Sequence, residues 1–127
     1  MRKSVQTFSA CLVAAAFAVQ SVVAFAADVP ELANARKVSE DAKGDGTHTY
    51  YKSTTSPGDL VEAYKGELSS DGWSIVNAGG GGSSWGGGAT LTATKGSTYL
   101  VLDAGGESGE THIDLCVWPS KPDDDDC

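Results

Sequence analysis

Few side chains in this sequence could carry out chemistry, and they are widely spaced. His48 and His112 fall in two segments with strand-like composition, and Asp114 shares a strand face with His112 because strand side chains alternate in direction. Two histidines and a carboxylate are ligand types that zinc accepts. Strand histidines without such a role are more common, however, so we expect no metal ion and no other cofactor.

Three further segments approach known motifs but lack essential residues. Residues 106–109 (Gly-Glu-Ser-Gly) begin like a nucleophile elbow, but Glu110 replaces the final glycine and a strand is predicted to follow where a helix is required. Residues 41–52 carry lysines at two ligand positions of a calcium loop. The glycine-rich residues 79–88 lack the phosphate-binding patterns. We therefore expect no catalytic residues and no enzymatic activity.

The first 26 residues predict a secretory signal peptide. A positive start at Arg2 and Lys3 precedes an apolar stretch over residues 11–25, which ends in the small-x-small cleavage pattern at residues 24–26. The apolar stretch is shorter than the roughly 20 residues that span a bilayer. We expect cleavage before Ala27, export to the periplasm or the extracellular space, and no stable membrane span afterwards.

The charge of the chain argues against two classes of partner. The sequence has 9 Lys and Arg against 17 Asp and Glu, a net charge of −8, and loss of Arg2 and Lys3 with the signal peptide lowers it by 2 to −10. Nucleic acids and anionic lipid surfaces bind clustered positive charge. We therefore expect neither as a partner.

Two cysteines remain after the predicted cleavage, Cys116 and Cys127. In an oxidising compartment this pair could form a disulfide that holds the tail against the last strand. Alternatively, Cys116 is a strand residue and Cys127 a free thiol. Spacing alone does not decide between the two, because it does not fix connectivity.

The regular part of the chain predicts an α+β domain over residues 47–119. Ser56 is a natural N-cap, Pro57 suits the first helical position, and Gly72 supplies the left-handed residue that ends a helix. The apolar face of this helix consists of Leu60, Val61, Tyr64 and Leu68. Strands are predicted at 47–54, from Trp73, and at 89–94, 99–102 and 111–118, the last with Ile113, Leu115 and Val117 on its inner side. The expected fold is an antiparallel sheet of four to five strands with one packed helix, in the order β-α-β-β-β.

The remaining segments are predicted to be irregular. Residues 27–46 are mostly polar and indicate an irregular N-terminal arm, which could contain a short strand near Val38, and residues 120–127 indicate an acidic C-terminal tail. Residues 79–88 hold seven of the 16 glycines and predict a flexible hairpin loop. Trp85, within this loop, either packs on the sheet or contacts a partner, because a large aromatic side chain is costly to leave in water.

The motif Tyr64-x3-Leu68-x3-Gly72-Trp73, after a capped helix start and before a Gly/Ser segment, resembles a group of small exported bacterial α+β domains of unknown function. Members commonly open with Val-Pro-x-Tyr-Pro-Gly-Ala, of which residues 29–35 keep the valine, the proline and the last alanine. The resemblance spans nearly the whole mature chain. It implies an envelope location and an α+β fold, and it supplies no activity.

The function that these observations favour is that of an exported, non-enzymatic domain which binds a partner protein or a small ligand in the cell envelope. Trp85 is the candidate partner contact. Two alternatives stay open. One is a metal-binding protein or enzyme that uses His48, His112 and Asp114, and the other is a purely structural envelope protein.

We predict that the exported protein begins at Ala27, because the cleavage pattern precedes that residue. Intact-mass spectrometry of the exported chain measures this directly, and a mass that retains residues 1–26 would contradict the signal peptide.

The same spectra, recorded before and after alkylation, test for a disulfide between Cys116 and Cys127. Uptake of the alkylating agent without prior reduction would argue against the disulfide.

Overall fold

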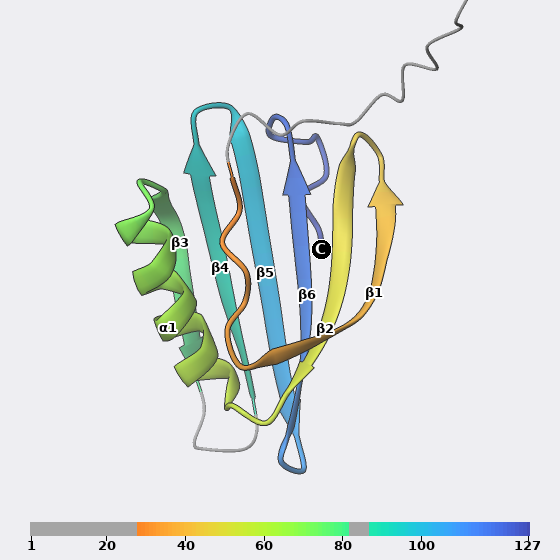
Figure 1. The fold of residues 1–127 in the computed structure, drawn as a ribbon, viewed down its shortest axis with the longest axis vertical. Helices are drawn as coiled ribbons and strands as arrows, with labels where there is room; N and C mark the ends of the chain where they lie inside the picture. Colours follow the sequence, from red (N-terminus) through yellow and green to blue (C-terminus); the bar gives the residue numbers. More distant parts are fainter. Residues whose placement is uncertain (1–27, 82–86) are drawn as a thin grey trace, which may run out of the picture.

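The computed structural model describes residues 28–81 and 87–127, so the predicted signal peptide and Trp85 lie outside the described residues. These two ranges form one antiparallel sheet of six strands with one helix on one face, which confirms the α+β class (Figure 1). The elements are β1 (Ala35–Lys43), β2 (Gly46–Ser53), α1 (Pro57–Ser70), β3 (Ser74–Gly81), β4 (Gly87–Lys95), β5 (Thr98–Glu107) and β6 (Glu110–Trp118).

The strands lie in the order β1-β2-β6-β5-β4-β3. A β1–β2 hairpin forms one edge, α1 carries the chain to β3 at the opposite edge, and β3 to β6 then return strand by strand. The last strand, β6, therefore pairs with β2, in a register that runs from Thr47 opposite Val117 to Ser53 opposite Thr111. This pairing joins the β1–β2 hairpin to the other four strands, so it connects segments that are far apart in sequence.

Within the predicted arm over residues 27–46, the short strand considered near Val38 is present and extends over nine residues. Residues 35–43 form β1, an edge strand whose side chains are nearly all exposed. Such a strand lacks the alternation of apolar and polar residues that identifies a half-buried strand, and its charges suit an open edge. The two-residue turn at Gly44-Asp45, with Gly44 at φ 61°, closes the hairpin. The sheet thus has six strands in place of the predicted four to five.

The predicted glycine loop over residues 79–88 is strand at both described ends. Gly79 and Gly80 lie in β3, and Gly87 and Gly88 begin β4, while residues 82–86 lie outside the described residues. Glycine is required at one of these positions, because a Cβ on Gly80 would lie 2.5 Å from the Cβ of Ala89. Close approach of the two strands, and not freedom of the chain, explains a glycine in β3.

The helix forms where the sequence predicts it. α1 begins at Pro57 after Ser56, and Gly72 takes the predicted left-handed conformation with φ 86°. The Ser56 side chain makes no capping hydrogen bond, and its carbonyl oxygen instead accepts the first helical hydrogen bond from the Leu60 amide at 2.9 Å. No helix in residues 28–81 or 87–127 is long and apolar enough to cross a membrane.

The core lies between α1 and the inner face of the sheet. The predicted apolar face of α1 is buried as expected, against β3, β4 and β5. The sheet contributes side chains from three neighbouring strands, of which Leu91, Leu100, Leu102 and Ile113 have no exposed surface. Ile113, Leu115 and Val117 face inward along β6, as predicted from their alternation.

The N-terminal segment (residues 28–34) extends this cover next to α1 (Figure 1). The Tyr64 hydroxyl donates a hydrogen bond of 2.8 Å to the Pro30 carbonyl, and the Ser53 hydroxyl donates one of 2.6 Å to the Asn34 carbonyl. Leu32 inserts its side chain into the core. These contacts fix an otherwise irregular segment over the inner face of the sheet.

We predict that Leu68→Ala lowers the free energy of unfolding by about 2–5 kcal/mol, because it leaves a cavity at a position with no exposed surface. Gly66→Ala on the same helix is the matched control. Its added Cβ meets no atom within 4 Å, so we expect a gain of about 0.5–1 kcal/mol from helix propensity. Urea denaturation measures both, and equal effects of the two substitutions would contradict the placement of α1.

Candidate functional site

A row of polar side chains runs along β2 and β6 on the outer face of the sheet, opposite α1. In the register of these two strands, His48 lies opposite Cys116 and Tyr50 lies opposite Asp114. Side chains that lie directly opposite on one face of an antiparallel pair have Cβ atoms about 4.5–5.5 Å apart. This outer row consists of His48, Tyr50, Lys52, Glu110, His112, Asp114 and Cys116.

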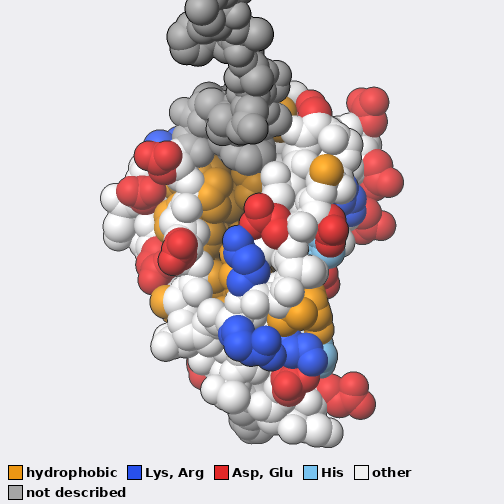
Figure 2. Space-filling model, turned by 45° about the vertical axis from the view of Figure 1, so that its right-hand side comes forward, with side chains coloured by type: hydrophobic (Ala, Val, Ile, Leu, Met, Phe, Trp, Pro, Cys, Tyr) orange, Lys and Arg blue, Asp and Glu red, His pale blue; other side chains and the backbone are white. Residues whose placement is uncertain are grey.

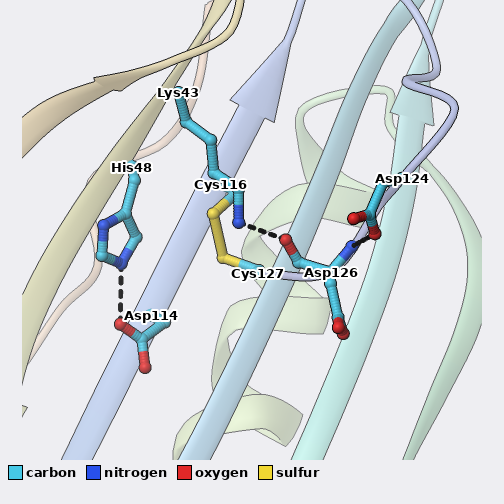
Figure 3. The surroundings of a disulfide bond; sticks show 7 residues. All are labelled: Lys43, His48, Asp114, Cys116, Asp124, Asp126 and Cys127. Atoms are coloured by element: carbon cyan, nitrogen blue, oxygen red, sulfur yellow. Dashed lines mark hydrogen bonds and ion pairs between the residues drawn. A yellow bond between two sulfur atoms is a disulfide. The ribbon is translucent and has the colours of Figure 1, made fainter.

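His48 and Asp114 form the first interaction in the outer row. His48 Nε2 lies 2.7 Å from Asp114 Oδ1, and both side chains are partly exposed (Figure 3). A carboxylate in this position fixes the orientation of the imidazole ring, as it does for histidines in catalytic and metal sites. The pair is therefore held in one geometry beside Cys116.

His112 makes a separate set of contacts. Its Nδ1 is hydrogen-bonded to the Tyr50 hydroxyl, and the two rings stack with centroids 6.0 Å apart and an interplanar angle of 12°. Its Nε2 lies 3.3 Å from Glu110 Oε1, which also lies 3.3 Å from Lys52 Nζ. Both ring nitrogens of His112 thus have partners within the outer row.

The structure consequently brings together only part of the residue set that the sequence suggested for a metal site. His48 and Asp114 are in contact, whereas His112 belongs to the neighbouring group around Tyr50 and Glu110. The sequence placed His112 and Asp114 on one face, which is correct. Cross-strand register, which the sequence does not give, assigns them different partners.

Cys116 and Cys127 form a disulfide in the structure, with Cα atoms 5.7 Å apart. The bridge lies beside His48 (Figure 3), and a ring nitrogen of His48 and both sulfur atoms lie within 4.8 Å of one another. Cys116 is fully buried and Cys127 is partly exposed. Of the two alternatives for this cysteine pair, the disulfide is the one that the structure contains.

The acidic C-terminal tail is held against the outer face by more than this bridge. Cys127 packs against an apolar cluster that includes Tyr99 and Trp118, and the Tyr99 hydroxyl donates a hydrogen bond of 2.8 Å to Asp125 Oδ2. Lys43 Nζ donates a hydrogen bond to the carbonyl oxygen of Asp126. The edge strand β1, of which the sequence suggested only a short part near Val38, therefore supplies the cation that holds part of the tail.

Carboxylates accumulate beneath the tail. Asp103 lies opposite Asp114 in the β5–β6 register. Partial burial raises the pKa of Asp103 above its ordinary value, the carboxylates of Asp114 and Asp126 raise it further, and Lys43 opposes the increase. The ionised form of Asp103 is therefore less favourable in the folded protein than in the unfolded chain.

A second candidate site lies on the inner face, where α1 does not cover the sheet. A groove of about 570 Å³ lies between the N-terminal segment and the β1–β2 hairpin. Tyr51, Leu115 and Val117 line it from the sheet, and Val29 and Leu32 line it from the N-terminal segment. Figure 2 shows hydrophobic side chains in a hollow of this face, with charged side chains on either side.

The sequence motifs that approach catalytic patterns have structural roles. Residues 106–109 include the turn between β5 and β6, where Ser108 and Gly109 both have positive φ angles. Asp41 and Asp45 belong to the β1–β2 hairpin. Neither the contact of Lys43 with the tail nor the groove was predicted from the sequence. The Gly-Asp turn signal at residues 44–45 would have indicated a hairpin, and hence the strand β1 that carries Lys43 and lines part of the groove.

These observations define the chain as an α+β domain with one six-stranded antiparallel sheet and one helix. No protein-family model, no curated protein and no solved structure matches it. The resemblance to small exported domains of unknown function stays a prediction.

We predict that Asp103→Asn stabilises the protein at neutral pH. The folded-state pKa of Asp103 is raised, so its contribution to stability falls as the pH rises from its ordinary pKa through the folded-state value. The substitution should raise Tm at pH 7 by about 2 °C and have little effect at low pH, where the carboxyl group is protonated in both states.

Asp45→Asn, in the exposed β1–β2 turn, removes the same charge and is the control for a general effect of net charge. Thermal unfolding between pH 3 and pH 8 measures both variants. Equal gains for Asp45→Asn and Asp103→Asn would assign the effect to net charge instead of local burial.

Proposed function

We propose that this protein is an exported, non-enzymatic binding domain whose ligand occupies the groove between the N-terminal segment and the β1–β2 hairpin. The observation that carries the proposal is a groove of mixed lining, with apolar Leu115 and Val117 from the sheet and Leu32 from the N-terminal segment beside polar and charged side chains. A volume of about 570 Å³ suits a small organic molecule. The ligand gains its affinity chiefly by covering apolar surface.

The polar groups around the groove favour one kind of ligand. Asp28, Glu31 and Glu40 supply three carboxylates against one cation, Lys37, which forms an ion pair of 2.5 Å with Glu40. Partial burial raises the pKa of Tyr51, so its hydroxyl stays neutral at physiological pH and can donate a hydrogen bond. The best match is an amphiphile with an apolar body and a cationic or neutral polar end.

Binding is favoured over catalysis by the composition of this site. Within the described residues, the lining of the groove includes carboxylates, Lys37 and Tyr51, which could transfer protons, but no serine or cysteine nucleophile beside a histidine base. The histidines lie on the opposite face, engaged with Asp114 and Tyr50. Contact of Trp85 with a partner remains a separate proposal, because that residue lies outside the described ranges.

Two features support the proposed export. The apolar segment before Ala27 has the pattern of a signal peptide, and disulfides such as Cys116–Cys127 persist mainly in oxidising compartments. A ligand encountered there would be a component of the envelope or of the surroundings of the cell.

The test is titration of the protein that starts at Ala27 with N-phenyl-1-naphthylamine, a neutral apolar fluorophore. We predict saturable binding, and displacement at lower concentration by decyltrimethylammonium than by decanoate, because carboxylates outnumber cations at the rim. Thr47→Trp should weaken binding at least about tenfold by filling the groove, since Thr47 lines it opposite Val117.

Thr92→Trp is the matched control, because Thr92 lies opposite Val101 on the outer face. Glu31→Gln, at the rim, should reduce the preference for the cationic amphiphile without closing the groove. Absence of saturable binding, or equal affinities for Thr47→Trp and Thr92→Trp with unchanged Tm, would reject the groove as the binding site.

A further inference from the structure

The corner of the outer face around the disulfide combines three kinds of metal-ligating atom. His48 lies directly opposite Cys116 in the β2–β6 register, and the tail returns Cys127 to the same place. A ring nitrogen of His48 and the two sulfur atoms lie within 4.8 Å of one another. Asp114 Oδ1 lies 2.7 Å from His48 Nε2, on the same strand face as Cys116 (Figure 3).

We propose that reduction of the Cys116–Cys127 disulfide converts this corner into a binding site for a thiolate-preferring divalent cation such as Zn²⁺. His48, Cys116 and Cys127 are the three protein ligands, a water molecule completes the coordination, and Asp114 is a positioning residue for the His48 ring. The site lies on the face opposite the proposed ligand groove, so either proposal can fail without the other.

The distances are compatible with tetrahedral coordination. With Zn–S near 2.3 Å and Zn–N near 2.0 Å, neighbouring ligand atoms in such a site lie about 3.3–3.8 Å apart. The present arrangement therefore needs movements of about 1 Å to 1.5 Å, with the sulfur atoms moving apart once their bond is broken. The β2–β6 pairing holds His48, Asp114 and Cys116 in place, and Cys127 in the tail provides the adjustment.

The charges around the site favour a cation. Asp103 lies opposite Asp114 in the β5–β6 register, and Asp126 directly precedes the bridged Cys127, so three carboxylates belong to this part of the outer face. Lys43 is the opposing charge, and its ammonium group is hydrogen-bonded to the Asp126 carbonyl. A divalent cation would relieve the repulsion among the carboxylates as well as bind the two thiolates.

The sulfur atoms can act as strong ligands only in the reduced state, because thiolates and not disulfide sulfurs bind zinc. A dithiol reductant attacks Cys127 Sγ, which belongs to the partly exposed residue of the pair, and releases Cys116. Its second thiol then releases Cys127 and closes the reductant's own disulfide, so two electrons and two protons reach the protein. Binding of Zn²⁺ displaces the two thiol protons.

This chemistry makes metal binding dependent on the oxidation state of the protein. The oxidised protein holds its tail by a covalent bond, and the reduced protein would hold it through the metal ion. Oxidation of the two thiolates to the disulfide would then release the ion, with the electrons passing to an oxidised dithiol or a comparable disulfide.

The test compares Zn²⁺ binding by oxidised protein and by protein reduced with a dithiol, freed of reductant and kept under an inert atmosphere. We expect one Zn²⁺ per reduced chain, at least about 100-fold tighter than binding by the oxidised chain, in competition with a chromophoric chelator. Co²⁺ in place of Zn²⁺ should give the absorption of tetrahedral coordination together with thiolate-to-metal charge transfer.

Three variants show which residues bind. His48→Ala should weaken binding to the reduced chain by at least about tenfold, and Asp114→Asn should also weaken it. His112→Ala is the matched control, since His112 is a histidine of the same strand pair whose contacts are to Tyr50 and Glu110, and we expect no change.

Equal binding by the oxidised and reduced proteins would overturn the proposal, as would absence of binding by the reduced protein. Equal affinities of His48→Ala and the unsubstituted reduced chain would overturn it too, because the two thiolates would then bind metal in a detached tail. Circular dichroism of the reduced protein with and without Zn²⁺ reports whether the sheet persists, and loss of the sheet in both samples would contradict a site built on β2 and β6.

Discussion

The pairing of β2 with β6 is the interaction on which the rest of this structure depends. It joins residues 47–53 to residues 111–117, so the loop that it closes contains α1 and three strands. Without it, the β1–β2 hairpin would have no neighbour in the sheet, and two-stranded hairpins are at best marginally stable in water. One register also sets both faces: Val117 lies opposite Thr47 toward the groove, and Cys116 lies opposite His48 toward the disulfide.

The two faces differ because α1 is narrower than the sheet. The helix packs against β3, β4 and β5, and the N-terminal segment covers further inner surface through single hydrogen bonds such as that from Tyr64 to the Pro30 carbonyl. A groove remains beside this segment. On the outer face, the tail covers Tyr99 and Trp118 with help from a covalent bond and from Lys43. Each irregular segment is thus fixed by a few specific contacts. The two candidate sites, the groove and the corner around the disulfide, lie beside these segments.

Local signals in the sequence predicted some elements accurately and failed for others. Pro57 and Gly72 marked the ends of α1 because backbone φ preferences act within a few residues, although the Ser56 side chain makes no cap. The alternation of Ile113, Leu115 and Val117 marked β6 because one face of that strand is buried. Only a short part of β1 near Val38 was suggested by the sequence, because an exposed edge strand has no buried face to produce a pattern. The glycines of β3 were predicted to belong to a flexible loop, whereas Gly80 is required by the close packing of β3 against Ala89 in β4.

The sequence by itself determined the α+β class, the position of the helix, the inward residues of β6 and the excess of negative charge. These properties follow from local conformational preference and from the periodic burial of side chains. Only the tertiary structure decided that His48 contacts Asp114 while His112 contacts Tyr50, that Cys127 returns to Cys116, and that a groove remains beside the N-terminal segment. Those outcomes depend on the register of strands that are distant along the chain, and register is an energetic property of the whole sheet that no single segment encodes.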